Sequence, residues 1–503
     1  MGARDFTLSD TIERNAQLHG ERLAFVFGEE QVTHAEHRTR VSRLAAGLRA
    51  AGLEAGDRIA IVSRNNREFV ELYGAAVMVG AMLVPISWRL SGDELVFAIE
   101  NAAPKVLLAD AEEQPKLAEL HRSRNWTMRC YGIGQSGGVF GAVAALYSDR
   151  PLDTAVSVAA DSPCLMLYTA ATDGRPKGAL LSHSSLLSGT GELLRSWSLS
   201  ADDVNLGVLP LFHLAGVIMI LATQQAGGAT VVLPGFDGPM ALRSIHSRKV
   251  TLLAEFPPIL QTLLDQARGG ELSSLRVVTG LDNAETIARL EREWPGATFW
   301  AAFGQSETSG FVTLSPYRER PGSAGRPTTH NRVLIVDDAD KPLTTGQTGE
   351  IAVKGPGVFL GYWQSHADTA FTLRNGWHHT GDLGAFDEHG YLWYKGRSPV
   401  KELIKPGGEN VYPAEVERII ASHPAIAEVA VIGVPDTQWG EAIKAVCVCK
   451  PSQAVTAQAL IDFVGERIAR YKRPKHVVFT DALPKTAGGA IDRAKVKDAH
   501  GHA

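Results

Sequence analysis

Apolar runs of strand length alternate with helix-like stretches along most of this 503-residue chain. A strand-like run at 59–62 leads into a helix-like stretch at 68–78, and short apolar runs at 105–108, 230–233 and 276–279 repeat the pattern farther along. Strands that alternate with helices form parallel sheets whose faces the helices cover. The sequence therefore predicts an α/β fold with a large N-terminal domain of two helix-covered, mostly parallel sheets.

The texture of the sequence changes in its second half. Between 333 and 393 short strands are interrupted by Gly and Pro, which is typical of a small antiparallel or barrel-like section. A charged link that contains Pro and Gly precedes a new helix start and a strand at 426–434. We therefore expect an N-terminal domain at 1–397, a hinge and linker at 398–408, and a small mobile α+β domain at 409–503.

The composition argues against several classes of protein. A formal net charge of -5, spread over both signs, gives no electrostatic reason to expect nucleic-acid binding. The longest apolar run, 214–222, is far shorter than the ~20 residues that span a bilayer. The four cysteines are too few and too scattered for a disulfide framework, and none has zinc-site spacing. We expect a cytoplasmic protein without a transmembrane segment that acts on small molecules.

A loop of small, hydroxyl and glycine residues follows directly after the apolar run 164–167. From Tyr168 to Gly178 it reads Tyr-Thr-Ala-Ala-Thr-Asp-Gly-Arg-Pro-Lys-Gly. Backbone N–H groups and threonine hydroxyls of such a loop can surround phosphate oxygens, while Lys177 supplies a positive charge. The loop lacks the Gly-Lys-Ser/Thr of a Walker A motif. It predicts an ATP site of another type.

This loop resembles that of the superfamily of acyl-CoA synthetases, peptide-synthetase adenylation domains and luciferases, which usually reads Thr/Ser-Ser-Gly-Thr-Thr-Gly-x-Pro-Lys-Gly. The chain agrees at Thr169, Thr172, Gly174 and the final Pro-Lys-Gly. It departs at Ala170, Ala171 and Asp173. An Asp adds negative charge beside polyphosphate, and Ala in place of Gly narrows the allowed backbone, so these departures bear on ATP affinity and loop mobility.

Further motifs of this family follow in the expected order over nearly the whole chain. Residues 209–216 look like the aromatic gate beside the acyl pocket. The segment from Phe303 to Glu307 resembles a Tyr/Phe-Gly-x-Thr/Ser-Glu motif, in which the ring flanks adenine, the hydroxyl approaches the α-phosphate and the carboxylate holds magnesium. Asp382 and Arg397 resemble the ribose-binding pair, because a carboxylate can accept from both sugar hydroxyls and a guanidinium can reinforce it.

The resemblance continues into the small domain. In such enzymes this domain swings about a hinge at the position of Glu402 and presents one face for adenylate formation and another for thioester formation. Lys472 and Arg473 lie in a cationic run where the family commonly contacts the phosphates of CoA. Family members carry a lysine in a Gly-Lys-Ile segment that bridges the substrate carboxylate and the α-phosphate, whereas this chain has Ala490 before Ile491. The intact flanks favour an introduced Lys→Ala change.

The resemblance implies ATP, Mg²⁺ and coenzyme A as cofactors. The catalytic group is then Thr169, Lys177, His213 and Glu307, with Ala490 at the position of the lysine and Glu307 as the magnesium ligand. The residues that bind ATP or CoA are Thr169, Thr172, Gly174, Lys177, Gly280, Phe303, Gly304, Ser306, Asp382, Arg397, Gly408, Lys472 and Arg473. Expected partners are the acid, ATP and CoA, a second copy of the chain in a homodimer, and a lysine acetyltransferase for a form with lysine at 490.

The acid is expected to bind among small and apolar side chains. The candidates are Phe212, His213, Ala215, Gly280, Leu281, Ala301, Ala302 and Gly310. Because none is a cation that could pair with a second carboxylate, the pocket favours an aromatic or medium-chain aliphatic monocarboxylic acid. An amino-acid substrate would need a carboxylate near its ammonium group, and Asp282 keeps that possibility open.

The predicted function is that of a carboxylic acid–CoA ligase. The acid attacks the α-phosphate of Mg-ATP to give an acyl-adenylate, and the thiol of CoA then displaces AMP. With Ala490, adenylate formation is expected to be poor, while a supplied acyl-adenylate can still react with CoA. Two alternatives stay open: an adenylation enzyme that loads a carrier protein, and a nucleotide-binding protein without turnover.

Overall fold

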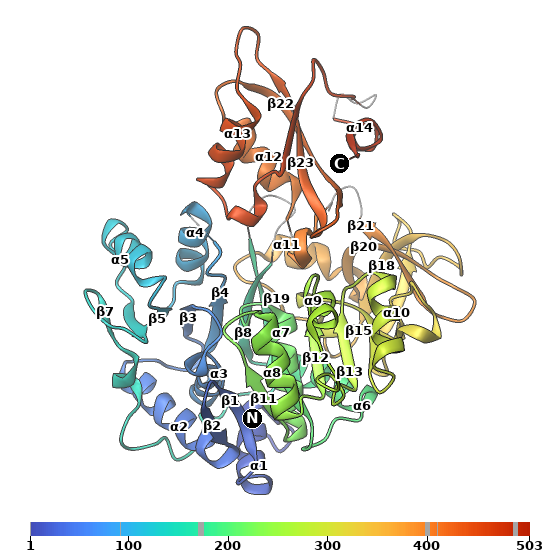
Figure 1. The fold of residues 1–503 in the computed structure, drawn as a ribbon. Coiled ribbons are helices and arrows are strands. Elements are labelled where there is room, and N and C mark those ends of the chain that lie inside the picture. Colours follow the sequence, from blue (N-terminus) through green and yellow to red (C-terminus); the bar gives the residue numbers. More distant parts are fainter. Residues whose placement is uncertain are drawn as a thin grey trace.

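The computed structural model describes residues 2–90, 92–169, 176–397, 403–409, 411–485 and 491–502. The N-terminal and central parts of the chain form one large body, and the last hundred or so residues form a smaller domain above it (Figure 1). Two large sheets, of eight and nine strands, make up most of the body. This arrangement confirms the predicted α/β fold with a large N-terminal and a small C-terminal domain.

The eight-stranded sheet has the order β19-β9-β8-β4-β3-β5-β6-β7 and is parallel from β8 to β7. Two antiparallel pairings, β8 with β9 and β9 with β19, close its other edge. Its strands are β3 (Arg58–Val62), β4 (Met82–Ile86), β5 (Val106–Asp110), β6 (Arg129–Ile133), β7 (Phe140–Ala142), β8 (Pro163–Thr169), β9 (Lys177–Ser182) and β19 (Gly361–Tyr362).

The nine-stranded sheet has the order β16-β15-β14-β13-β12-β10-β11-β1-β2. It is parallel from β14 to β1 and antiparallel at both edges. Its strands are β1 (Leu23–Phe27), β2 (Glu30–Thr33), β10 (Val204–Gly207), β11 (Ala229–Val232), β12 (Leu252–Glu255), β13 (Val277–Gly280), β14 (Thr298–Gln305), β15 (Gly310–Pro316) and β16 (Arg326–Pro327).

Helices cover both sheets, and local sequence fixes where several of them begin and end. Asn66 caps α3 by accepting a hydrogen bond from the Phe69 N–H at 2.8 Å, and Gly80 ends it with φ +76°. One large apolar cluster joins both sheets to the helices between them. The helices are α1 (Leu8–Leu18), α2 (His34–Ala50), α3 (Arg67–Val79), α4 (Gly92–Ala102), α5 (Gln114–Ser123), α6 (His183–Ser196), α7 (Leu214–Ala226), α8 (Gly238–Arg248), α9 (Ile259–Gln266) and α10 (Ala284–Glu293).

The predicted section of short strands is a four-stranded antiparallel sheet with the order β17-β18-β20-β21. It has its own apolar cluster, which includes Phe303 of the neighbouring sheet. Its strands are β17 (Arg332–Val336), β18 (Gly349–Lys354), β20 (His378–Phe386) and β21 (Leu392–Arg397), and the short helix α11 (His366–Thr372) precedes β20.

The small domain packs two helices and a further C-terminal helix around a three-stranded sheet, β22-β23-β24. Its elements are α12 (Pro413–Ala421), β22 (Ile426–Asp436), β23 (Gly440–Cys449), α13 (Ala457–Gly465), β24 (His476–Phe479) and α14 (Arg493–His500). Within the described ranges, every helix is too short or too polar to cross a membrane.

Candidate functional site

A cavity of about 570 Å³ lies where the two large sheets, the four-stranded sheet and the small domain meet. The last residues of four strands line it, namely Thr169 of β8, Glu255 of β12, Gly280 of β13 and Gln305 of β14. Open α/β sheets bind their ligands beyond the carboxyl ends of the strands, because loops and helix starts there leave a crevice. This cavity is therefore the candidate active site.

The two segments predicted to hold the phosphates and the metal meet at one wall of this cavity. Thr169 Oγ1 donates to Glu307 Oε1 at 3.3 Å, and the Tyr362 hydroxyl donates to the same oxygen at 2.8 Å. Burial, reinforced by Glu307, raises the pKa of Tyr362 well above its usual range, so this phenol stays protonated and remains a donor. The carboxylate is thereby held in one orientation.

Lys177 brings a positive charge to the same wall. Its Nζ lies 2.5 Å from Asp368 Oδ1 in α11 and 5.8 Å from the centre of the Tyr362 ring. Both Lys177 and Asp368 line the cavity. The ammonium group thus lies in the cavity wall that also holds Glu307, and Asp368 balances its charge. Thr172 and Gly174 lie outside the described residues.

The Asp382 carboxylate is buried and surrounded by donors. Arg397 Nε lies 2.9 Å from Asp382 Oδ1, and the Tyr394 hydroxyl donates to this oxygen at 3.1 Å. Gln305 Nε2 donates to the other carboxylate oxygen. Arg397 in turn donates to the Tyr412 hydroxyl at 2.7 Å, which links the four-stranded sheet to the small domain. The predicted ribose-binding pair is therefore assembled and charge-balanced.

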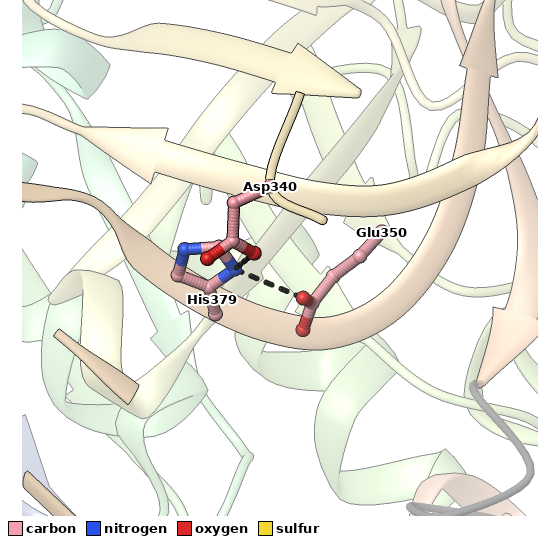
Figure 2. Close-up of side chains that lie close together, drawn as sticks. All are labelled: Asp340, Glu350 and His379. Carbon is pink, nitrogen blue, oxygen red and sulfur yellow. Dashed lines mark hydrogen bonds and ion pairs between the residues drawn. The ribbon is translucent and has the colours of Figure 1, made fainter. Parts of the chain in front are cut away.

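Asp340, Glu350 and His379 form an ion-pair network (Figure 2) that contacts the backbone next to Asp382. Glu350 accepts from the Gly381 N–H at 2.8 Å and lies 2.9 Å from His379 Nδ1 through its second oxygen. The ligand atoms of Asp340, Glu350 and His379 lie within 4.8 Å of one another, as in a metal site. Arg374, however, contacts Asp340 at 2.9 Å and Glu350 at 3.1 Å. Arg374 thus pairs with both carboxylates of the network, and the network holds strand β20 at Gly381, next to Asp382.

Glycines bring the strands around the nucleotide region close together. A side chain at Gly280, whose φ is +141°, would meet the Glu255 carbonyl oxygen at 1.8 Å, and one at Gly304 would meet the Gly310 carbonyl oxygen at 2.1 Å. The Phe303 ring lies beside them at the cavity wall, 6.2 Å from the Tyr394 ring. The Phe303 ring offers the cavity an aromatic surface of the kind that stacks on a base. Ser306 also lines the cavity.

His213 stands at the deeper, apolar end of the cavity as the N-cap of α7. Its Nδ1 accepts from the Ala215 N–H at 3.2 Å, so Nε2 carries the proton. Burial, helped by the positive charge of Arg89, lowers the pKa of His213 to about 4, and the ring is neutral at pH 7. The other predicted pocket residues found in the lining are Ala215, Gly280, Leu281, Ala301, Ala302 and Gly310.

Phe212 is the one predicted pocket residue that does not line this cavity. Its ring lies 5.8 Å from the guanidinium of Arg89. Successive side chains point in different directions, and it is His213 whose ring meets the cavity, edge-on to Phe256 at 6.2 Å. The prediction placed both neighbours in the pocket, whereas in this structure only His213 lines it.

The small domain contributes Lys405 and Tyr412 to the cavity. The backbone pairing of Ile404 with Val411 holds this segment as a short hairpin, and Gly408 lies in its turn. Lys485 and Ile491, which flank the segment with Ala490, pair with each other and do not line the cavity. Glu402 and Ala490 themselves lie outside the described residues. The hairpin face of the small domain is therefore the one that meets the large domain.

Lys472, predicted to contact the phosphates of CoA, is ion-paired between the two domains in this structure. It is only 3% exposed, and its Nζ contacts Glu94 of α4 and, at 2.8 Å, Glu415 of α12. Its positive charge therefore forms ion pairs between the two domains, because two carboxylates contact it in place of water. The neighbouring Arg473 is exposed.

Sequence reasoning missed several residues that shape the site. They are Gln305, Tyr362, Asp368, Tyr394, Lys405 and Tyr412. Gln305 could have been considered, because it is the variable position inside a recognised motif. Tyr362 lies in β19, which pairs with β9, the strand that begins at Lys177. The others carried no signal, because only the packing of distant segments brings their hydroxyl, amine or carboxylate groups to the cavity.

Known proteins share both the sequence and the architecture of this chain. The family model for AMP-binding enzymes matches residues 12–363, and the model for their C-terminal domain matches residues 415–490. Indoleacetate–CoA ligase from Aromatoleum aromaticum is 35% identical over 501 residues, with 97% of each chain covered. Feruloyl-CoA synthase from Amycolatopsis is 35% identical over 492 residues, covering 96% of this chain and 97% of the relative.

A solved structure from Rhodopseudomonas palustris, named as a long-chain-fatty-acid CoA ligase, is 47% identical, with a TM-score of 0.77. The match covers 79% of this chain and 100% of that one. Both domains of this chain are thus matched by a family model, and the relatives align with it along nearly their whole length. The chain therefore belongs to the adenylate-forming superfamily of AMP-binding enzymes, as an ATP-dependent acid–thiol ligase of the AMP-forming acyl-CoA synthetase type.

Proposed function

We propose that this enzyme joins an aromatic or medium-chain aliphatic monocarboxylic acid to coenzyme A through an acyl-adenylate. The observation that carries the proposal is the shared cavity, in which Lys177, Glu307 and Asp382 stand at one end and the apolar surroundings of His213 at the other. A nucleotide and an acid bound in these two parts would bring a carboxylate to the α-phosphate. Positioning and charge neutralisation then suffice for the chemistry, without a nucleophilic side chain.

We assign a role to each group at the nucleotide end of the cavity. Phe303 flanks adenine, Asp382 and Arg397 hold the ribose, and Thr169, Lys177 and Ser306 contact phosphates, with Thr172 and Gly174 of the phosphate loop and Gly280 and Gly304 at the base. Among the described residues, both hydroxyl donors to Glu307 use Oε1 and leave Oε2 for a hard cation. A bound Mg²⁺ would neutralise charge on the phosphates. Lys177 adds a second positive charge there.

The acid end supports a mostly hydrophobic substrate body. Leu214, Ile218, Met219 and Phe256 surround His213 in the lining. The relatives named for indoleacetate and ferulate act on aromatic acids, which fits this lining. The neutral imidazole of His213 can donate from Nε2 without repelling or attracting the substrate by charge.

The orientation of the small domain supports thioester formation as the step served by this arrangement. The hairpin with Lys405 and Tyr412 closes the cavity, while Lys485 and Ile491 lie elsewhere. We place the hinge at Glu402, with domain boundaries at 1–397, 398–408 and 409–503. In this arrangement CoA would enter between the domains, and the exposed Arg473 is a candidate for its phosphates. Adenylate formation would require the domain to turn and present position 490.

The experiment compares this chain with its Ala490→Lys variant, using ATP, CoA and a panel of carboxylic acids. Acid-dependent ATP–pyrophosphate exchange should rise by about 10²–10³ in the variant, because a positioned charge that stabilises a developing anion is restored. Both forms should convert a preformed acyl-adenylate and CoA to thioester at similar rates. Equal exchange rates would contradict the assignment of position 490.

Two further outcomes of this experiment would redirect the proposal. Preference for a phosphopantetheinylated carrier protein over CoA would indicate a carrier-loading enzyme. Tight nucleotide binding without thioester from any adenylate would indicate a binding protein without turnover. Cytoplasmic localisation, a homodimer and acetylation of the form with lysine at 490 remain predictions, open to fractionation, light scattering and mass spectrometry respectively.

A further inference from the structure

One buried carboxyl group in the cavity has no side-chain hydrogen-bond partner among the described residues. Glu255, the last residue of β12, is 0% exposed, and within the described part of the chain its carboxyl oxygens have no side-chain partner, while the Leu260 N–H at the start of α9 lies near them. Its neighbour across the sheet is Gly280, which has no side chain to offer. A buried polar group without a partner is destabilising, so its presence calls for a reason.

The other buried glutamates in the described ranges show how unusual this is. Each of them has an ion-pair or hydrogen-bond partner: Glu71, Glu94, Glu113, Glu192, Glu307 and Glu415. Glu192, for example, accepts from the main-chain N–H groups of Thr329 and His330. The chain thus pairs its buried carboxylates wherever they serve only the fold, and Glu255 is the exception.

Glu255 has a second carboxyl group nearby and otherwise apolar surroundings. Burial raises the pKa of Glu255 well above its usual range, Asp282 adds to this effect, and the Leu260 amide at the start of α9 acts in the opposite direction. Asp282 Oδ2 is also buried without a partner. Both residues line the cavity, together with Ile287 and Phe299. The result is an acidic spot in an apolar wall.

We propose that Glu255 determines specificity by accepting a hydrogen bond from an N–H or O–H group at the end of the acid remote from its carboxylate. The substrate class is therefore a monocarboxylic acid that carries such a donor, for example a phenol, an indole N–H or an amine. This inference rests on the proposed function, since it concerns the acid of the same reaction.

A donor fits this spot better than the other polar groups a substrate could carry. A second carboxylate would be buried beside two carboxyl groups with no cation to pair with it, which is costly. An ether or ester oxygen can only accept, so it could pair only with the single O–H of the protonated Glu255 and would leave the carbonyl oxygen of Glu255 without a donor. A substrate with an apolar remote end would leave the buried oxygens unpaired. A pocket with such oxygens therefore binds analogues that lack the donor more weakly.

The experiment uses this chain with CoA and synthetic acyl-adenylates, so that the residue at position 490 does not matter. The probes are the adenylates of four 3-phenylpropanoic acids whose para substituent is hydroxyl, methoxy, methyl or aminomethyl. Thioester formation gives kcat/KM for each. We expect the hydroxyl compound to exceed the methyl and methoxy compounds by about 10²-fold or more. The aminomethyl compound, which is a cationic donor, should share this advantage.

Variants then tie the preference to one side chain. Glu255→Leu should abolish the advantage of the hydroxyl compound, mainly through KM. Glu255→Gln keeps an acceptor and should retain the advantage of the hydroxyl but lose that of the aminomethyl compound, because the amide cannot ionise. Glu192→Gln is the matched control: it alters a buried, paired glutamate outside the cavity, so it should change stability but not the ratio of hydroxyl to methyl.

The outcomes separate this inference from the function on which it rests. If no adenylate yields a thioester, the proposed function fails. If all four react but the hydroxyl compound has no advantage over the methyl compound in the unaltered chain, the role of Glu255 is refuted while the ligase function stands. The same conclusion follows if Glu255→Leu retains the full advantage. The comparison within the unaltered chain decides the matter even if that variant does not fold.

Discussion

Replacing Lys472 with methionine removes the cation that pairs with two buried carboxyl groups between the domains. Its Nζ contacts Glu94 and Glu415, and the three side chains are only 4%, 5% and 4% exposed. Glu94 belongs to α4 of the large domain and Glu415 to α12 of the small one. The variant Lys472→Met therefore leaves two carboxyl groups facing each other at the interface.

The size of the effect follows from what these carboxyl groups can still do. Breaking a buried ion pair by removing one partner costs about 3–5 kcal/mol. Burial raises the pKa of Glu415 to about 7, so it can take up a proton near neutral pH. Glu94 also keeps the hydrogen bond from the Ala469 N–H at 2.9 Å. We therefore expect the lower end, about 3 kcal/mol, which is roughly 10²-fold in the ratio of closed to open domain arrangement.

Hydrogen exchange measures this opening directly. The Ala469 N–H bonds across the interface to Glu94 Oε2, so its exchange reports on domain separation. Exchange in peptides that contain Ala469 should accelerate by about 10² in Lys472→Met. Lys475→Met is the control, because Lys475 is half exposed and pairs with Asp436 inside the small domain. A change in Lys472→Met no larger than in this control would refute the reasoning.

Three further perturbations test other parts of the site. Tyr362→Phe removes a hydroxyl that bonds Glu307 at 2.8 Å, so KM for Mg-ATP should rise about 5- to 10-fold, as the loss of about 1 kcal/mol predicts; an unchanged KM would contradict this. Glu350→Ala frees the Gly381 N–H, so discrimination between ATP and 2′-deoxy-ATP in nucleotide titrations should fall; an equal loss of affinity for both would indicate a general defect. His213 has a pKa of about 4 instead of about 6.5, so stability is present above pH ~6.5 and is lost as pH falls through 4. Urea unfolding of His213→Gln should therefore show a pH dependence weaker by about 3 kcal/mol over that range, and identical profiles would refute it.

The sequence alone predicted the architecture and brought the main polar groups of the site together. Alternating strands and helices indicate parallel sheets, and the resemblance of two motifs to those of one family placed Thr169 and Glu307 in one cavity before any coordinates. Local motifs also placed Lys177, Asp382 and Arg397 there. The roles of these residues and the exact domain boundaries stay predictions, because a motif places a group but does not show what it binds.

Only the tertiary structure decided which charges are available. Lys472 reads as a surface cation in sequence, but it is buried because Glu94, 378 positions away, packs against it. Lys405 and Tyr412 reach the cavity through the packing of one domain on another. Glu255 looks like any strand-end glutamate until its unpaired oxygens are seen. Burial and pairing depend on contacts between distant segments, and a local pattern of residues carries no information about them.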